Sequence, residues 1–329
     1  SLPAAARMFA PAAWGWIADH TGAHRGVVVL SCASMVLCFG ALPFAGTFAS
    51  IAALIGVTGV LSAGALPLVE AMTLGAPGGP ARYGPIRLWG SVGFILVVLA
   101  GGVAMDHLPV SLLPGWMVFF AMSAMAVAAG LPRGAPHDSP TWRLSIPKGA
   151  WPVLADGFCM TLAHGALYAF FTLHLQRAGY SGTAIGILWT LGVVAEIFVF
   201  AYLPRLVRRH ALSTILIASF LCAVVRFLAI AWASAFVAVL VVAQVLHAAT
   251  FGSFHAASVA AMHRIFPAQA QARAQALFSS LSYGAGGAAG ALAAGWAWET
   301  AGPSLAFSLA ALAGLVGAYF AYALRRAGL

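Results

Sequence analysis

The 329-residue sequence has very few charged residues. Asp, Glu, Lys and Arg together make up 7% of the chain, while 62% of its residues are hydrophobic. Soluble domains carry about 25% charged residues, so the chain lacks the polar surface that a soluble fold needs. This shortage excludes soluble enzymes, soluble nucleic-acid-binding domains and secreted scaffolds, and it indicates an integral membrane protein.

Cysteine is also scarce, and its distribution excludes further kinds of chemistry. All four cysteines lie inside apolar segments, where a thiol behaves as a small hydrophobic group; they are Cys32, Cys38, Cys159 and Cys222. The sequence contains no CxxC pair, no disulfide framework, no cofactor-binding motif and no nucleophile–base pair. We therefore expect no metal or cofactor site and no enzyme activity.

Acidic residues are outnumbered by basic ones, 7 against 16, which gives a formal net charge of +9. A basic excess can signal a nucleic-acid-binding surface. Here the basic residues lie in short gaps between apolar runs, which is the positive-inside pattern of a membrane protein. The expected partner is the lipid bilayer, and no nucleic-acid binding is expected.

Long apolar runs dominate the chain. A helix needs about 20 mostly apolar residues to cross the hydrocarbon core of a bilayer. Charges, prolines and glycine turns divide the chain into eleven such runs, which predicts an all-α polytopic membrane protein. The runs cover residues 2–18, 26–45, 48–72, 86–105, 111–131, 149–176, 182–204, 212–232, 235–263, 271–297 and 303–325. The proline-rich gap 132–148 predicts a linker between an N-terminal bundle, 1–131, and a C-terminal bundle, 149–329.

The basic residues also fix the expected orientation. Alternate gaps and the C-terminal tail hold Arg25, Arg82, Arg133, Arg143, Lys148, Arg205, Arg208, Arg209, Arg264, Arg273, Arg325 and Arg326. The intervening gaps hold only Arg177. Because basic loops stay in the cytoplasm, we expect the linker 132–148 and the C-terminus on the cytoplasmic side of a bacterial inner membrane.

The two expected bundles differ in length by about one helix. Five apolar runs precede the linker and six follow it. Segments 86–106 and 279–299 both combine a glycine-rich stretch with an acidic residue near their ends, which is a faint internal repeat. Two equivalent halves are therefore expected, with a first helix that precedes Ser1 and is absent from the sequence.

A loop motif follows the first apolar run. It reads Gly15-Trp-Ile-Ala-Asp19-His-Thr-Gly22-Ala-His-Arg25 and resembles the signature loop of the major facilitator superfamily. The resemblance implies a fold of two six-helix bundles and a loop that latches the cytoplasmic side of the outward-open state. The alternative is a capped loop in which Asp19 caps a helix, Gly22 allows a tight turn and Arg25 reaches the headgroups.

Other segments narrow this resemblance. Residues 83–94 (YGPIRLWGSVGF) resemble the start of the fifth helix of lactose-permease-like symporters. Four further segments resemble the 3-phenylpropionic acid transporter group; they are 164–168 (HGALY), 176–181 (QRAGYS), 191–197 (LGVVAEI) and 246–251 (LHAATF) with His255. The similarity covers nearly the whole chain from residue 7 onward, and it implies a proton-coupled symporter.

Ionisable residues inside apolar runs are candidate functional groups, because they are costly there unless they are paired or hydrated. Glu196 is the expected proton carrier, and the alternative is a static ion pair with an arginine. Arg226 is the expected receptor for a substrate carboxylate, because its guanidinium can bind one in a bidentate way. Its alternative role is that of a counterion for Glu196.

The imidazoles lie at similar depths in the same half. His247 and His255 are candidates for a proton relay, or simply for satisfied polar groups; eight residues put them about 80° apart around an α-helix. His164 and Tyr168 are candidates for hydrogen bonds with the substrate or with a neighbouring helix. Asp156 is a further candidate for substrate binding, and we expect all these groups to line one polar cavity.

Glu70 and Arg87 flank the loop 73–85. They are a possible ion pair for substrate binding or gating, and the alternative is that both side chains reach the interface separately. We expect a monomeric secondary transporter, and the resemblance to the 3-phenylpropionic acid transporter group implies a proton symporter of a small aromatic carboxylate. Symport of a sugar or nucleoside, drug efflux and a membrane assembly factor without transport activity are the alternatives.

Overall fold

The computed structural model describes residues 9–75, 79–132, 146–267 and 271–326, and every element in these ranges is a helix. The α-helices are α2 (Ala10–Thr21), α3 (His24–Ala41), α4 (Phe48–Ser62), α5 (Ala65–Gly75), α6 (Gly79–His107), α7 (Leu113–Ala129), α8 (Ala150–Arg177), α9 (Gly182–Arg209), α10 (Leu212–Ala233), α11 (Val237–Val245), α12 (Phe254–Ile265), α13 (Gln271–Ser279), α14 (Gly287–Ala301) and α15 (Pro303–Arg326). Two short 3₁₀ turns, η1 (Leu42–Phe44) and η2 (Val110–Leu112), and two π-helical segments, η3 (Ala248–Ser253) and η5 (Ser280–Gly286), complete the set.

Nine helical segments in the described ranges are long and apolar enough to cross a membrane. They correspond to nine of the expected spans, and one of them, Phe48–Thr73, combines α4 with α5. The expected span 2–18 begins in residues that are not described and continues into α2, while the expected span 271–297 is the continuous run α13–η5–α14. The prediction of an all-α polytopic membrane protein is confirmed.

Local sequence signals account for where several helices begin and end. The Thr47 hydroxyl accepts a hydrogen bond from the backbone N–H of Ser50, whose side chain accepts one from the backbone N–H of Thr47, so the two form a capping box at the start of α4. Ser181 caps α9 through the N–H of Ala184. Gly22 ends α2 with a left-handed φ of 67°, which glycine adopts without steric cost.

The helices form two compact units. The C-terminal unit contains Phe94–Asp106 and Leu144–Leu329, and the N-terminal unit contains Leu2–Gly93 and His107–Arg143. The predicted linker 132–148 lies mostly outside the described residues. The part of α6 from Phe94 to Asp106 groups with the C-terminal unit, although its sequence position suggested the N-terminal bundle.

Close backbone packing explains this grouping of α6. A Cβ atom on Gly102 would lie 2.5 Å from the carbonyl oxygen of Gly182, so only glycine permits the observed approach of α6 to α9. The Asp106 carboxylate accepts hydrogen bonds from the backbone N–H groups of Gly182 and Thr183, at 2.5 and 2.8 Å. These N–H groups are at the N-terminus of α9, where they have no partner within the helix and a negative charge is favourable.

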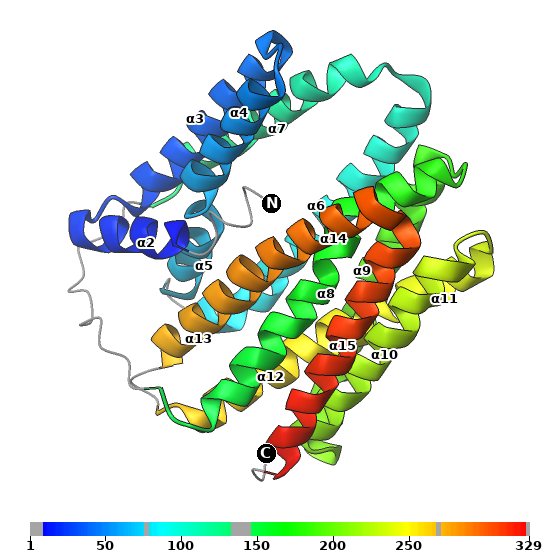
Figure 1. Cartoon of the computed structure of the whole chain (residues 1–329). Helices are drawn as coiled ribbons and strands as arrows, with labels where there is room; N and C mark the ends of the chain where they lie inside the picture. Colours follow the sequence, from blue (N-terminus) through cyan, green and yellow to red (C-terminus); the bar gives the residue numbers. More distant parts are fainter. Residues whose placement is uncertain (1–8, 76–78, 133–145, 268–270, 327–329) are drawn as a thin grey trace. The chain divides into compact units, whose positions relative to one another are not determined.

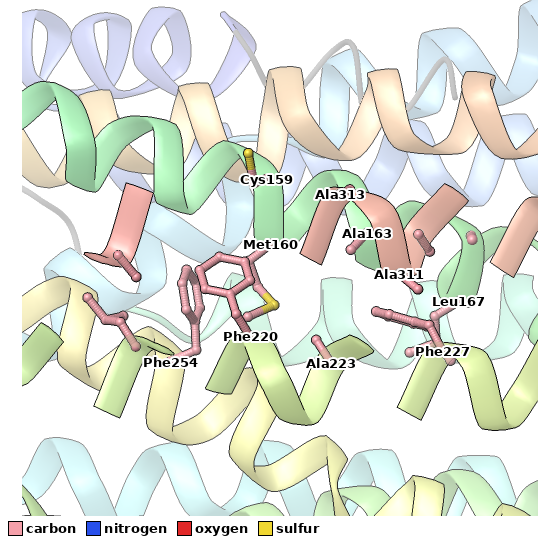
Figure 2. Close-up of a cluster of buried hydrophobic side chains, with 14 of the residues drawn as sticks. Cys159, Met160, Ala163, Leu167, Phe220, Ala223, Phe227, Phe254, Ala311 and Ala313 are labelled. Carbon is pink, nitrogen blue, oxygen red and sulfur yellow. The ribbon is translucent and has the colours of Figure 1, made fainter. Parts of the chain in front are cut away.

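The C-terminal unit has the larger core. In it α15 packs along both α8 and α10, and these three helices lie side by side in Figure 1. Figure 2 shows Met160 of α8 beside Phe220 of α10 and Phe254 of α12, and the two phenyl rings meet edge to face at 5.6 Å. The core of the N-terminal unit is small; its buried residues are Ala18, Val27, Val28, Cys32, Leu68 and Ala128.

Candidate functional site

Arg226, near the middle of α10, is completely buried. Its guanidinium donates hydrogen bonds to Oε1 of Gln244 at 3.1 Å and to Oγ1 of Thr250 at 3.2 Å, and it lies 3.4 Å from Nε2 of His164. His164 Nδ1 is 2.9 Å from the carbonyl oxygen of Met160, which can only accept. Nδ1 therefore carries the proton, and Nε2 offers a lone pair to Arg226.

The Arg226 cluster, formed by Arg226, His164, Gln244, His247 and Thr250, contains no acidic residue. Within the part of the chain that the structure describes, the ion pairs do not include Arg226, and its hydrogen-bond partners are all neutral acceptors. Three buried nitrogens of the cluster have no hydrogen-bond partner among the described residues; they are Nε of Arg226, Nε2 of Gln244 and Nδ1 of His247. The cluster thus has a buried positive charge and unused donors, which together favour an anion.

Aromatic rings continue from the Arg226 cluster in both directions. Tyr168 lies 6.0 Å from His164 and is stacked on Trp189 at 6.1 Å. On the other side, Phe251 is stacked on His247 at 5.5 Å and on His255 at 6.4 Å. We call these six residues, together with Tyr283, the aromatic strip. A planar ring of a ligand could be inserted or stacked along this strip.

The π-helical segment η3 places His247 and His255 on the same strip. An unbroken α-helix would separate them by about 80°, but η3 lies between them and has a wider turn. Because each residue of η3 advances less than an α-helical residue around the axis, residues 247, 251 and 255 come close to alignment. His255 Nδ1 also lies 2.8 Å from the hydroxyl of Tyr283 on η5. π-Helical segments occur frequently at functional sites.

Glu196 faces the same region from α9. A Cβ atom on Gly252 of η3 would lie 3.2 Å from Cγ of Glu196. One turn earlier on α9, a Cβ atom on Gly192 would lie 3.3 Å from Cδ2 of His247. Since residues four apart share a helix face, the face of α9 that carries Glu196 packs on η3 and on the Arg226 cluster.

Asp156 lies apart from these groups. It is fully buried on α8, and it precedes His164 by eight residues, which is about 12 Å along a helix. Met160 lies between Asp156 and His164 on the chain, and its side chain lies beside Phe220 and Phe254 in Figure 2. The structure therefore brings together Arg226, His164, His247, Tyr168 and His255, with Glu196 facing the same region, and leaves Asp156 behind an apolar layer.

Comparison with known proteins gives a family. The model of the family described as "MFS_1 like family" matches residues 1–309. The chain belongs to this family. It is therefore a major facilitator superfamily transporter, a multi-pass membrane protein and not an enzyme, as the sequence predicted.

Two named relatives of this transporter differ in their cargo. The "Probable 3-phenylpropionic acid transporter" of Escherichia coli (strain K12) is 34% identical over 250 residues, which cover 71% of this chain but only 63% of the relative. The "Maltose permease" of Geobacillus stearothermophilus is 28% identical, over 96% of this chain and 82% of the relative. The cargo in each name is that of the relative alone.

Solved structures agree on the fold of this transporter. The nucleoside transporter NupG superposes with a TM-score of 0.78 at 17% identity, over 98% of this chain and 88% of that one. A mutant of the peptide transporter POT in complex with alafosfalin gives a TM-score of 0.77 at 15% identity, over 99% of this chain and 85% of that one. At these identities the likeness establishes the major facilitator fold and nothing about the cargo.

The signature loop of this transporter is held by its own contacts. Nε2 of His24 lies 2.9 Å from Oδ1 of Asp19, and Gly22 between them has the positive φ that the turn requires. Arg25 donates to the carbonyl oxygen of Leu131 at 3.5 Å. Asp19 thus pairs with His24 of the loop, a partner that the resemblance to the family motif did not indicate. No described atom lies within 4 Å of the position of a Cβ on Gly15, so packing does not require glycine there.

The predicted pair of Glu70 and Arg87 is only partly described. Glu70 lies half-buried on α5, while the side chain of Arg87 lies outside the described residues. A metal site is not formed by the described residues either, since no three His, Cys, Asp or Glu side chains in these ranges come together.

Sequence reasoning missed Gln244 and Tyr283, and it noted Phe251 only as part of the segment 246–251. Gln244 gave a usable signal, because it is an amide inside an apolar run that otherwise reads VAVLVVAQV. Tyr283 gave none, since an aromatic residue inside a span most often packs against other side chains.

Proposed function

We propose that this transporter moves a small aromatic carboxylate together with a proton. The observation that carries the proposal is the full burial of Arg226 among neutral acceptors. Burying a cation without an anionic partner is costly, and a guanidinium binds a carboxylate through charge-assisted hydrogen bonds. A substrate carboxylate would supply the missing negative charge and accept from the unused nitrogens of Gln244 and His247.

The aromatic strip supports a substrate that also carries a ring. Tyr168 is 56% exposed although it is stacked on Trp189 and lies close to His164, so part of its ring surface is accessible to a ligand. A ring stacked there would leave a short aliphatic chain to reach Arg226. Phenylpropionic acid, the compound in the name of one relative, has this form.

Proton coupling is assigned to Glu196, with His255 and His247 as relay groups. A carboxyl group inside a bundle can bind a proton on one side of the membrane and release it on the other as its surroundings alternate. Glu196 packs on η3, which carries the histidines at its two ends. The signature loop of Gly15, Asp19, Gly22 and Arg25 and the pair Glu70 and Arg87 serve in gating.

Uptake into proteoliposomes tests the substrate class. Labelled 3-phenylpropionate should accumulate when the lumen is more alkaline than the medium, and cold 3-phenylpropanamide, which has the same ring and no charge, should compete poorly. Maltose and uridine represent the sugar and nucleoside alternatives. Competition by either of them, or equal competition by the amide, would contradict the proposal, and uptake of none would favour an assembly factor without transport activity.

Arg226→Met separates charge recognition from packing, because methionine fills a similar volume without charge. Loss of the charge-assisted hydrogen bond should weaken binding of 3-phenylpropionate by about 1.5–3 kcal/mol, or about 10- to 150-fold. Arg209→Met, an exposed arginine at the end of α9, is the matched control and should leave affinity unchanged. An unchanged affinity in Arg226→Met would remove the anion receptor from the proposal.

We also assign the linker 132–148 and the C-terminus to the cytoplasm of a bacterial cell, and a monomer as the working unit. Single cysteines introduced at residues 138 and 328 of a cysteine-free variant should both resist a membrane-impermeant maleimide added to intact cells. Labelling of one site but not the other would contradict the orientation, since the two positions are expected on the same side.

A further inference from the structure

Asp156 is a buried carboxylate that nothing in the described chain neutralises. It has no exposed surface, and neither carboxylate oxygen has a hydrogen-bond partner among the described residues. A buried and unpaired charge is unfavourable in any protein interior, and more so in a membrane-spanning helix. A carboxylate in this position calls for a bound proton or another small cation.

The helix geometry shows what lies opposite Asp156. His164 of α8 lies 3.4 Å from Thr250 of η3, and four residues earlier on α8 Met160 lies beside Phe254, four residues after Thr250 (Figure 2). The two segments are therefore antiparallel and in register at four-residue steps. One further step brings Asp156 opposite Ser258 of α12, beyond the Met160–Phe254 layer.

Ser258 resembles Asp156 in its burial and in its lack of a hydrogen-bond partner among the described residues. It is also fully buried, and its hydroxyl has no hydrogen-bond partner in the described ranges. The buried hydroxyl of Ser282 on η5, which abuts Gly157 next to Asp156, has no partner in the described ranges either. Buried hydroxyls are nearly always hydrogen-bonded, so the unpartnered hydroxyls of Ser258 and Ser282 beside an unpartnered carboxylate point to a missing ligand.

Neighbouring titratable groups do not neutralise Asp156. The elements packed against α8 include α12, η5, α14 and α15, and Phe278 of α13 abuts Gly157, the residue after Asp156. The titratable groups of α12, η5, α14 and α15 are His255, which bonds to Tyr283, and His263, Arg264, Glu299, Tyr319, Tyr322, Arg325 and Arg326, which are exposed; α8 itself adds the Cys159 thiol and His164. None of them makes an ion pair or hydrogen bond with Asp156 in the described structure.

We propose that Asp156 and Ser258 form a binding site for one monovalent cation, a proton or Na⁺, separate from the Arg226 cluster. A carboxylate and a hydroxyl are oxygen ligands of the kind that hard cations prefer, and a protonated carboxyl can donate to the serine hydroxyl. The proposal does not depend on the cargo assigned to Arg226, because Met160 separates Asp156 from His164 along α8 and Phe254 separates Ser258 from Thr250 along the facing segment.

Infrared difference spectroscopy of the full chain in lipid nanodiscs tests the site without any substrate. Wild-type protein in choline chloride should show a protonated-carboxyl band that Asp156→Asn lacks and that Glu299→Gln, a change at an exposed carboxylate, retains. If the band persists when Na⁺ replaces choline, the site holds a proton. If the band disappears with rising Na⁺, the site takes Na⁺.

Ser258→Ala gives a second test that preserves the carboxylate. Losing one oxygen ligand should raise the cation concentration at half-saturation of the infrared signal about tenfold. Ser34→Ala, a buried serine whose hydroxyl donates to the carbonyl oxygen of Ser31, should leave it unchanged. The proposal is overturned if wild type and Asp156→Asn give the same spectra in choline and in Na⁺, or if Ser258→Ala and Ser34→Ala both leave the titration unaltered.

Discussion

The two units of this transporter bury different kinds of polar groups. In the described N-terminal unit the buried polar residues are Ser31, Ser34 and Thr58, and each donates its hydroxyl to a backbone carbonyl of a helix. In the C-terminal unit a guanidinium, a carboxylate and imidazoles are buried, and several of their atoms have no partner among the described residues. Hydroxyls that bond to helix carbonyls only complete the packing. A ligand can bind where buried groups have hydrogen-bonding atoms without a partner.

The units also differ in how deeply their helices are packed. The span Ala150–Arg177 of the C-terminal unit has 61% of its most apolar window buried, while His24–Phe44 of the N-terminal unit has 33%. Closely packed helices hold polar groups at fixed distances, and selective binding requires such fixed distances. We therefore expect recognition to reside in the C-terminal unit, and substitutions in the two units can test this.

Glu196→Gln should have the largest effect, because it removes the titratable group and keeps size and hydrogen-bonding capacity. Accumulation of 3-phenylpropionate against a gradient should be abolished, since a neutral amide releases no proton on the inner side. Exchange of internal for external substrate should continue, because the loaded carrier then reorients without deprotonation. Counterflow and uphill uptake in proteoliposomes measure the two activities.

The control for this prediction is Glu299→Gln, at an exposed carboxylate, which should retain both activities. Full uphill uptake by Glu196→Gln would assign coupling to another group. His255 is then the first candidate within the aromatic strip, and Asp156 is the candidate outside it. The infrared test of the cation site is independent of this outcome, because it needs no transport.

Gly290→Ala should destabilise the C-terminal unit by about 3 kcal/mol, the upper end for adding a methyl group to a packed core. Its Cβ would lie 2.2 Å from the carbonyl oxygen of Leu162, which is backbone and cannot move aside locally. Gly287→Ala on the same helix has no described atom within 4 Å of the new methyl group. The apparent midpoint of thermal unfolding in detergent should fall for the first variant alone.

The sequence predicted some of these features and could not predict others. The spans followed from hydropathy, and Glu196 and Arg226 followed from the cost of charge in a membrane. The alignment of His247 with His255 did not follow, because η3 departs from the 3.6-residue period of an α-helix. Asp156 was expected in the same cavity as Arg226. Depth along the bilayer cannot reveal an intervening layer of Met160 and two phenylalanines, since that depends on how each helix is rotated.

The same change, a buried threonine to valine, can be compared in both units. Thr250 of the C-terminal unit accepts a hydrogen bond from Arg226 at 3.2 Å, while Thr58 of the N-terminal unit donates to the carbonyl oxygen of Leu54 at 2.7 Å, and both are buried. Thr250→Val removes an acceptor from a buried cation and should cost about 1.5 kcal/mol of stability. Thr58→Val loses only a bond to its own helix, whose carbonyl keeps its backbone partner, and should change stability by less than about 0.5 kcal/mol. Unfolding of the two variants in the same detergent gives the comparison directly, and equal losses would mean that the guanidinium does not depend on Thr250. Addition of 3-phenylpropionate should then restore more stability to Thr250→Val than to Thr58→Val, because the carboxylate would replace the lost acceptor of Arg226.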